Sequence, residues 1–303
     1  MKVLFVASHN QGQFAAFVRE QAQALTSLGV EVELFGIEGH GIKGYLQNLG
    51  ALKQKIRSFQ PHVIHAHFGL SGVLANLQSD VPVVTTYHGC DINTLKLRMI
   101  SLPALLHSRY NIFVSVNQLQ KLPNWLRRRH EVLPCGVDCD AIRQIAKADA
   151  RRELGLQQDK KYILFSSSFS RSEKNYPLAE QAMSQIPDAQ LLEFKGYDRA
   201  QVYVLMHAVD CGLLTSIREG SPMFTKELLA CGTPVVSTNV GDVSEQFKDV
   251  DGAYITTFDS NDVAAKVQEA LDRNNRVTLP PDWMQRYDNR AIAKRLIEIY
   301  NSL

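Results

Sequence analysis

The stretch CGLLTSIREGSPMFTKELLACGTPVVS, residues 211–237, decides the fold of this chain. It opens on a short apolar run, Cys211 to Leu214, and passes through a polar loop. It takes on helical character from Pro222 and closes on a second apolar run, Pro234 to Ser237. A strand, a helix and a strand in this order form a βαβ unit, whose two strands lie parallel in one sheet. The stretch therefore predicts an α/β fold with a parallel sheet.

The same alternation of apolar runs and amphipathic segments continues along the chain in both directions. In the second half it predicts strands at Tyr162–Ser166 and Ala189–Phe194. In the first half it predicts strands at Val3–Ala7, Glu31–Phe35, His62–Ala66, Val81–Thr86 and Ile112–Val116. A chain of 303 residues exceeds what one hydrophobic core usually supports. We therefore expect two successive doubly wound units, with a boundary near residues 138–155.

The composition excludes several classes of protein. A hydrophobic content of 45% with 21% charged residues is that of a folded globular enzyme. No apolar run reaches the roughly 18 residues that a membrane span needs, and residues 1–7 are too short for a signal peptide, so a cytoplasmic location is expected. Five cysteines without a framework spacing indicate reduced thiols and no metal site. The net charge of +2, with its basic excess in the first half, is too weak to indicate nucleic-acid binding.

The loop and helix inside the opening stretch have the form of an anion or sugar site. Ser221 is a candidate helix cap and Pro222 suits the first helical position. The helix N-terminus would then point free N–H groups and a positive dipole at the loop. Glu219 and Glu227, eight positions apart, can accept hydrogen bonds from hydroxyl pairs on different parts of one ligand. The alternative is a capped surface helix with solvated acids.

With its two glutamates, this stretch resembles the retaining glycosyltransferases of family 4, which have the GT-B fold, and the resemblance covers nearly the whole chain. It implies an α/β architecture of two Rossmann-like doubly wound domains that face a central cleft. Residues 1–140, joined by a C-terminal helix over 283–303, would bind the acceptor, and residues 141–282 would bind the nucleotide-sugar donor. In the family the first glutamate and the following backbone hold the donor sugar, and the second glutamate holds the ribose. These roles fall to Glu219, Gly220, Ser221, Pro222, Met223, Phe224 and Glu227.

A second candidate group follows the strand that ends near Ser166. Arg171 and Lys174 lie in a serine-rich loop at a strand's carboxyl end, where open α/β sheets bind ligands. An arginine fork and a lysine charge suit a diphosphate, although such a pair is also common as a solvated surface patch. The resemblance implies that both cations neutralise the leaving diphosphate.

Strand ends in the first half supply the remaining candidates. His88 resembles the histidine of the family's His-Gly segment, which faces the donor sugar and the reacting centre. His67 is a candidate cleft residue, and Asp91 is a candidate either to orient His88 or to receive an acceptor hydroxyl. Gly12 and Gln13 occupy the place of the family's acceptor loop, which usually has paired glycines where this sequence has only Gly12.

Two further segments match the family pattern with less specific roles. Val132–Asp138 resembles the hinge strand that precedes the crossover into the second domain. Thr238–Glu245 resembles the loop after the nucleotide-binding helix, where Gly241 is the candidate to line the site.

The hypothesis is transfer of a sugar from a UDP- or GDP-sugar to an acceptor hydroxyl with retained configuration, without a metal or a cofactor. His88, Glu219, Arg171 and Lys174 would carry catalysis, and the leaving phosphate would accept the proton. The acceptor would be a carbohydrate or a lipid-linked molecule, in bacterial surface polysaccharide or glycolipid synthesis. The alternatives are a nucleotide-sugar epimerase or phosphorylase on the same fold, and a catalytically silent sugar-binding subunit.

Peripheral contact with an anionic membrane is a further hypothesis. The segment Trp125–His130 combines a tryptophan with three arginines, and Lys96, Arg98 and Arg109 add to the basic first half. The alternative is a solvated helix end.

Overall fold

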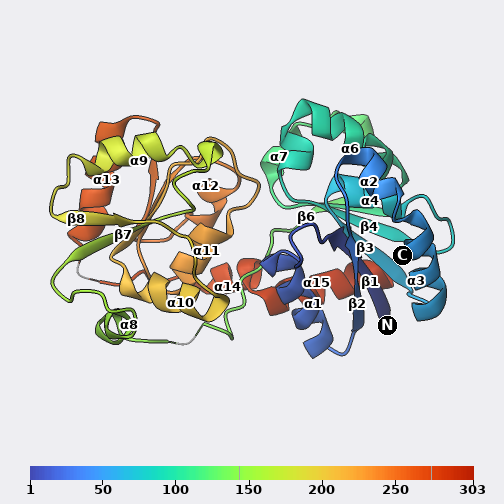
Figure 1. Ribbon diagram of the computed structural model, residues 1–303, viewed down its shortest axis with the longest axis horizontal. Coiled ribbons are helices and arrows are strands. Elements are labelled where there is room, and N and C mark those ends of the chain that lie inside the picture. Colours follow the sequence, from blue (N-terminus) through green and yellow to red (C-terminus); the bar gives the residue numbers. More distant parts are fainter. Residues whose placement is uncertain (143, 274) are drawn as a thin grey trace. The chain divides into compact units, whose positions relative to one another are not determined.

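The computed structural model describes residues 1–142, 144–273 and 275–303. The chain divides into two compact units, each of which is described by itself. Unit 1 comprises Met1–Gly136 with Arg286–Leu303, and unit 2 comprises Val137–Gln285. Each unit is a parallel sheet with helices packed on its faces (Figure 1). The α/β, doubly wound class predicted from the alternating pattern is confirmed.

Unit 1 is built on a six-stranded sheet in the order β2-β1-β3-β4-β5-β6, and all of its strand pairs are parallel. The strands are β1 (Lys2–Ser8), β2 (Glu31–Ile37), β3 (Val63–His67), β4 (Val83–Tyr87), β5 (Tyr110–Phe113) and β6 (His130–Val132). The helices are α1 (Ala16–Ser27), α2 (Gly41–Leu46), α3 (Leu49–Phe59), α4 (Gly69–Ala75), α5 (Cys90–Asn93), α6 (Leu95–His107), α7 (Val116–Gln120) and α15 (Asn289–Asn301).

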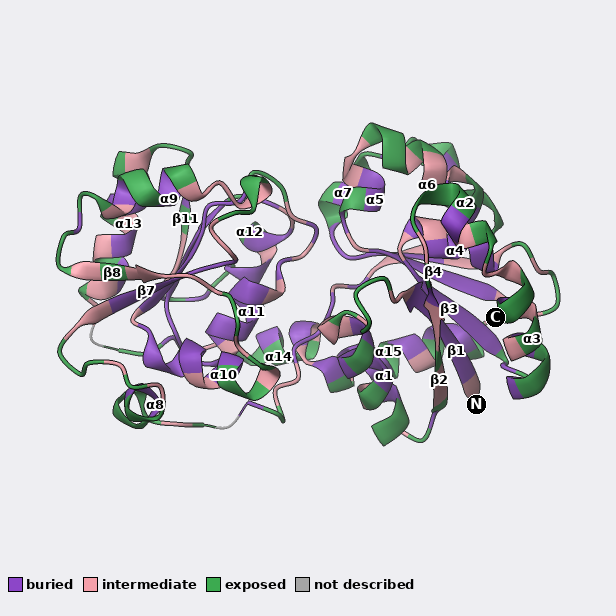
Figure 2. Cartoon of the chain, in the orientation of Figure 1, coloured by how far each residue is buried: buried purple, intermediate pink, exposed green. Residues whose placement is uncertain are grey.

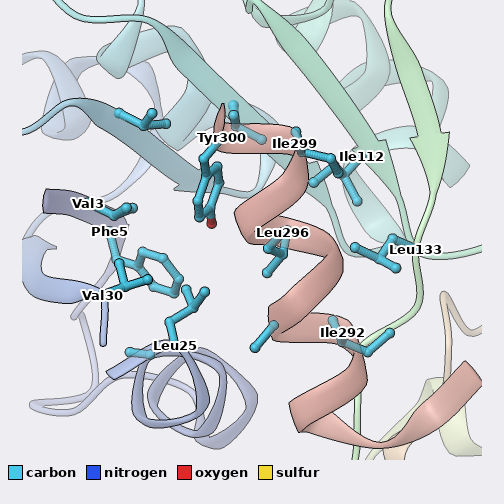
Figure 3. Packing of buried hydrophobic residues seen from close by; sticks show 14 of the residues in the cluster. Val3, Phe5, Leu25, Val30, Ile112, Leu133, Ile292, Leu296, Ile299 and Tyr300 are labelled. Carbon is cyan, nitrogen blue, oxygen red and sulfur yellow. The ribbon is translucent and has the colours of Figure 1, made fainter. Parts of the chain in front are cut away.

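The two faces of this sheet bury alternate side chains of the same strands. On β1, Val3 and Phe5 belong to one apolar cluster, and Leu4 and Val6 belong to another on the opposite face. Helix α15 closes the first cluster with its residues Ile292, Leu296, Ile299 and Tyr300 (Figure 3). The last helix of the chain is therefore part of the core of unit 1.

The C-terminal segment differs from the single helix expected over 283–303. It forms two helices, α14 (Pro281–Tyr287) and α15, which are separated at Asp288. The carboxylate of Asp288 accepts hydrogen bonds from the backbone N–H groups of Arg290 and Ala291 and so caps α15. The expected hinge strand Val132–Asp138 is also wrong in extent, because β6 ends at its first residue.

Unit 2 has a five-stranded parallel sheet in the order β11-β10-β9-β7-β8. The strands are β7 (Lys161–Phe165), β8 (Ala189–Leu192), β9 (Cys211–Leu214), β10 (Val235–Thr238) and β11 (Ala253–Thr256). The helices are α8 (Lys147–Glu153), α9 (Tyr176–Met183), α10 (Arg199–Ala208), α11 (Met223–Ala230), α12 (Val243–Gln246), α13 (Ser260–Leu271) and the first part of α14, which ends in unit 1. Figure 2 shows the central strands buried and the outer helix faces exposed.

Strand order places a topological switch point in each sheet. In unit 1 the chain runs from β1 to β2 on one side and then to β3 on the other, so the switch lies between β1 and β3. In unit 2 the switch lies between β7 and β9 for the same reason. Open α/β sheets bind ligands outside the carboxyl ends of the strands at such points. The loops after these four strands are therefore expected to form the ligand-binding site of each unit.

Candidate active site

In unit 2 the loops after β7 and β9 are tied together by an ion pair. Lys174 Nζ lies 2.6 Å from Glu219 Oε1, and Ser216 Oγ donates to the same oxygen at 2.7 Å. Both charged side chains are mostly covered, with 14% and 16% of their surface exposed. The hydroxyl of Thr215 donates to the carbonyl of Lys174 at 2.9 Å and fixes the backbone between the loops. The structure thus brings Lys174 and Glu219 together at the switch point.

Arg171, the second expected cation, lies in the same loop but has a local partner. Its guanidinium binds the carboxylate of Glu173, and 56% of the arginine side chain is exposed. The pKa of Glu173 is lowered by a backbone hydrogen bond and by Arg171. The guanidinium is therefore held by an exposed contact that another anion can replace at little cost.

Helix α11 begins one residue later than expected and without the predicted cap. Pro222 occupies the N-cap position, with φ −64° and ψ 124°, and no side chain caps the helix. Ser221 instead donates to Asp242 Oδ2 at 2.8 Å and accepts from Lys226 Nζ at 2.9 Å. The prediction that Ser221 caps this helix is wrong, because a buried acid and a buried lysine use its hydroxyl.

These contacts belong to a buried polar network that sequence reasoning missed. We call Ser221, Lys226, Asp242 and Gln246 the loop network. Lys226 is fully buried, and Gln246 donates to Asp242 Oδ1 at 2.7 Å. Burial raises the pKa of Asp242, while the charge of Lys226 opposes this shift. The network fixes the loop that carries Glu219 and Gly220. Its only signal in the sequence was a lysine on the apolar side of a helix.

Gly241 supports the same loop from behind. Its φ of +63° is in the left-handed region, and a Cβ at this position would lie 2.7 Å from the carbonyl oxygen of Gly220. Only glycine fits both constraints. Gly241 therefore lines the loop as a packing residue.

Glu227 lies on α11, facing the first turn of α10. Its carboxylate accepts a hydrogen bond from Arg199 at 2.5 Å, and the guanidinium also packs over the ring of Tyr203 at 4.7 Å. Phe224 is buried and packs against Phe194 with ring centroids 5.9 Å apart. Met223 is half-buried in the first turn. The residue expected to hold the ribose is therefore already paired with Arg199, which sequence reasoning did not single out.

In unit 1 the loop after β4 presents His88 beside the end of β3. His88 Nε2 lies 3.1 Å from His67 Nδ1, so the two histidines expected in the site are in contact. The carboxylate of Asp91 accepts hydrogen bonds from the backbone N–H groups of His88, Gly89 and Gly69. Burial raises the pKa of Asp91 to about 6. In this structure Asp91 orients the backbone of the His-Gly loop.

A pocket lies at the switch point of unit 1, on the loop after β1. Its volume is about 570 Å³. Gln13 lines it together with the end of β1, the start of α1 and parts of two neighbouring loops: Ala7, Ser8, Asn10, Gln11, Phe14, Ala15, Ala16, Val18, Arg19, His40 and Phe68. Gly12 belongs to the same loop, with φ +71°. The candidate acceptor loop therefore forms one wall of a cavity large enough for a sugar ring.

Neither a metal site nor a membrane-spanning helix is found in the part of the chain that the structure describes. No group of three histidine, cysteine, aspartate or glutamate side chains has the arrangement of a metal site. No helix there combines the length and apolar character that crossing a membrane requires.

Comparison with known sequences finds a glycosyltransferase family model in each half of the chain. The model of glycosyltransferase family 4 matches residues 37–141, and that of glycosyl transferases group 1 matches residues 172–273. TuaC of Bacillus subtilis, provisionally assigned as a teichuronic acid biosynthesis glycosyltransferase, is 28% identical over 64% of this chain and 57% of its own length. A D-inositol 3-phosphate glycosyltransferase of Mycolicibacterium smegmatis is 26% identical over 70% of this chain and 60% of its own length. The chain thus spans less than two thirds of these relatives.

Solved structures share the whole fold. Sucrose-phosphate synthase from Thermosynechococcus elongatus superposes with a TM-score of 0.82 at 19% identity, covering 100% of this chain and 98% of that one. HepE from Anabaena, in complex with UDP and glucose, superposes with a TM-score of 0.78 at 18% identity and covers 100% of both chains. With two family matches in succession and the shared two-domain fold, this chain belongs to the family 4 glycosyltransferases of the GT-B type.

Proposed function

We propose that this chain transfers a glycosyl group from a nucleoside-diphosphate sugar to an acceptor hydroxyl, with retained configuration. The observation that carries the proposal is the Lys174–Glu219 pair at the switch point of unit 2. A cation there suits a diphosphate, and a carboxylate beside it suits sugar hydroxyls. A nucleotide sugar contains both a diphosphate and sugar hydroxyls, so an adjacent lysine and glutamate suit it.

The roles of the donor-side residues follow from their chemistry. Lys174 and Arg171 stabilise the negative charge that develops on the leaving diphosphate, as fixed charges do in other enzymes. Glu219 accepts hydrogen bonds from hydroxyls of the transferred sugar, and Glu227 accepts them from the ribose. The loop network holds the backbone of Gly220–Phe224 in place beneath them.

The reaction balances without an added base or metal. The bond from the anomeric carbon to the diphosphate breaks, and a bond from that carbon to the acceptor oxygen forms on the same face. The acceptor's proton passes to the departing phosphate oxygen. His88 orients or polarises the reacting groups in this scheme.

The site assignment is tested by Lys174→Met and Glu219→Gln in an assay of nucleoside diphosphate release. Loss of a fixed transition-state contact should lower kcat/KM by about 10²–10³-fold. Matched controls are Lys266→Met and Glu269→Gln, an exposed lysine–glutamate pair on α13. Near-normal turnover in both site variants would refute the assignment.

Donor and acceptor classes are inferred from chemistry and from the relatives. HepE was crystallised with UDP and glucose, and TuaC is named for teichuronic acid synthesis. We therefore propose a UDP- or GDP-sugar donor and a carbohydrate or lipid-linked acceptor in surface polysaccharide or glycolipid synthesis. A thermal-shift screen with UDP-, GDP- and ADP-sugars should show stabilisation by one nucleotide class. No shift with any of them would contradict the proposal, and an epimer formed from donor alone would indicate an epimerase.

We also propose that unit 1 docks on an anionic membrane surface. Leu95, Met99 and Trp125 are 65%, 60% and 63% exposed, and the first two lie one turn apart on α6. Arg98 links α6 to the end of α7 through the carbonyl of Lys121 at 2.7 Å. Apolar side chains beside cations fit the boundary of an anionic bilayer.

The docking proposal is tested by flotation with liposomes of mixed anionic and neutral lipid. The protein should float with anionic liposomes at low salt, and less so with neutral ones. The double variant Met99→Ser/Trp125→Ser should lose binding, whereas Phe258→Ser, an exposed aromatic of unit 2, should retain it. Failure of the unaltered protein to float at low salt would exclude stable docking.

A further inference from the structure

Three histidine rings lie face to face at the ends of β3 and β4 in unit 1. We call His65, His67 and His88 the histidine stack. The centroids of His65 and His67 are 4.6 Å apart with an interplanar angle of 22°, and those of His67 and His88 are 5.3 Å apart with an angle of 23°. Phe17 and Phe68 pack on His88 at 4.5 Å and 4.7 Å. Packing therefore fixes the orientation of the His88 ring.

His65, at the inner end of the stack, forms hydrogen bonds with core residues outside the stack. His65 Nδ1 bonds to the hydroxyl of Tyr300 at 2.6 Å, and its Nε2 bonds to Thr86 Oγ1 at 2.7 Å. Both nitrogens of His65 are thus used within the core. His65 packs against His67 but exchanges no proton with it.

The outer end of the stack is His88, the ring with a proposed role in transfer. His67 Nδ1 lies 3.1 Å from His88 Nε2, and Cys135 Sγ lies 3.4 Å from His88 Nδ1. Each nitrogen of His88 therefore has a partner within unit 1. Which partner donates depends on where the protons of the two histidines reside.

The proton of His67 is placed by its surroundings. His67 is fully buried, and desolvation lowers its pKa to about 3, so near pH 7 it is neutral and carries one N–H. Its Nε2 is buried and has no hydrogen-bond partner in the portion of the chain that the structure describes. Buried N–H groups without an acceptor are rarer than under-satisfied acceptors. The proton therefore resides on Nδ1 and is donated to His88 Nε2.

We propose that His67 holds His88 in the tautomer protonated at Nδ1, and that the Cys135 sulfur accepts the hydrogen bond from this N–H until a ligand oxygen replaces the thiol. His88 accepts at Nε2, so its own proton must lie on Nδ1. Thiol sulfur is a weak acceptor and is readily displaced by a hydroxyl or phosphate oxygen. His67 is a positioning residue, and its role in transfer rests on the function proposed above.

The tautomer is measured directly by long-range ¹H–¹⁵N NMR of protein labelled at the histidine rings, with His88 assigned by its loss in His88→Gln. The unaltered protein should show His88 protonated at Nδ1. His67→Leu removes the donor, so His88 should change to the Nε2-protonated form that a free histidine side chain favours. His67→Asn places an amide N–H near the position of Nδ1 and should preserve the original tautomer.

Cys135→Ala separates the roles of the two partners in the same spectrum. Because His67 sets the tautomer, His88 should remain protonated at Nδ1 when the thiol is removed. A change to the Nε2 form in this variant would assign the control to Cys135 and overturn the proposal. So would an Nε2-protonated His88 in the unaltered protein, or an unchanged tautomer in His67→Leu.

Kinetics then test whether the tautomer matters for transfer. His67→Leu should lower kcat by about 10²-fold, the lower end of what a positioned proton-transfer group contributes, with little change in KM for the donor. His67→Asn should recover most of the loss, and His62→Leu, an exposed histidine of the same unit, should change neither constant. Equal kcat in the Leu and Asn variants would refute the positioning role.

Failure of this inference and failure of the proposed function are distinguishable. The NMR experiment needs no substrate, so it decides the tautomer even if no donor is turned over. Active enzyme with an Nε2-protonated His88 would leave the function standing and the inference refuted. Circular dichroism and the thermal unfolding midpoint without ligand establish that His67→Leu is folded before its spectrum is interpreted.

Discussion

Replacing Lys226 by methionine is the sharpest test of the loop network. Lys226 is fully buried, and its ammonium is 2.9 Å from Ser221 Oγ and close enough to Asp242 to influence that carboxyl's pKa. Methionine preserves the apolar stem and removes the charge. Asp242, which is 5% exposed, is then left buried without its cation. Removing one member of a buried pair costs about 3–5 kcal/mol of unfolding free energy.

The loss of unfolding free energy should depend on pH, because Asp242 can become neutral by taking up a proton. Neutralising an ordinary aspartate costs about 4 kcal/mol at pH 7 and about 1.5 kcal/mol at pH 5, taking its unfolded pKa as about 3.9. In the variant the folded pKa of Asp242 rises further, so the folded state binds the proton more readily than the unfolded state. Stability then falls as pH rises above the unfolded pKa. The loss in Lys226→Met should therefore be larger at pH 7 than at pH 5.

Unit 2 contains a built-in reporter for this measurement. The indole of Trp283 is buried and donates to the carbonyl of Gln246 at 3.2 Å, beside the network. In a Trp125→Phe background it is the remaining tryptophan of the two in the sequence. Urea unfolding followed by its fluorescence gives the stability of unit 2 at each pH.

Two further variants make the result decisive. Lys226→Met/Asp242→Asn removes both charges and should recover much of the loss at pH 7. Lys248→Met, at an exposed lysine of the same unit, should stay within about 0.5 kcal/mol of the unaltered protein. Equal destabilisation by Lys226→Met at both pH values, or no recovery in the double variant, would refute the reasoning.

Three further predictions concern residues that hold the candidate site residues in position. Gly241→Ala places a methyl group against the carbonyl of Gly220 and puts alanine in the left-handed backbone region. The unfolding free energy of unit 2 should fall by at least about 1–2 kcal/mol, and the thermal shift caused by the donor should become smaller. Burial raises the folded pKa of Asp91 to about 6, so the contribution of this carboxyl to the stability of unit 1 falls by about 3 kcal/mol as pH rises from about 4 to about 6. Asp91→Asn should abolish this pH dependence, which thermal unfolding at a series of pH values measures. Tyr300→Phe leaves His65 Nδ1 without its buried partner and should destabilise unit 1 by about 1–3 kcal/mol in urea, whereas an unchanged midpoint would show that the bond contributes nothing.

The fold was predictable because buried parallel strands are short apolar runs with distinct flanks. β9 appeared in the sequence with its observed bounds, Cys211–Leu214. β5 was predicted to start two residues and to end three residues too late; its end was misplaced because Val114 is buried beyond the strand and extends the apolar run. β11 was missed, because this edge strand is short and its Ile255 is 40% exposed. Pattern reasoning therefore performs best where both faces of a strand are buried.

The sequence allowed the candidate site residues to be identified, but not the contacts that they make with one another. Lys174 and Glu219 each follow a strand and so could be singled out, whereas their ion pair joins two loops 45 residues apart in the chain. Ser221 was predicted to cap a helix from local chemistry, yet Asp242, 21 residues away, takes its hydroxyl. Cys135, likewise, gave no local sign of its contact with His88. Local rules fail where a partner distant in sequence competes for the same donor or acceptor.

The participation of α15 in the first apolar cluster has a consequence for how the protein is made. The strands of unit 1 and helix α1 are complete by Val132, but α15, which packs beside α1 on the same face of the sheet, begins at Asn289. During translation all of unit 2 leaves the ribosome in between, so it can acquire its native structure while the cluster around Val3 and Phe5 still lacks α15. The unit nearer the N-terminus is thus the last to mature. In that interval the part of the sheet face that α15 later covers is an apolar surface to which chaperones can bind.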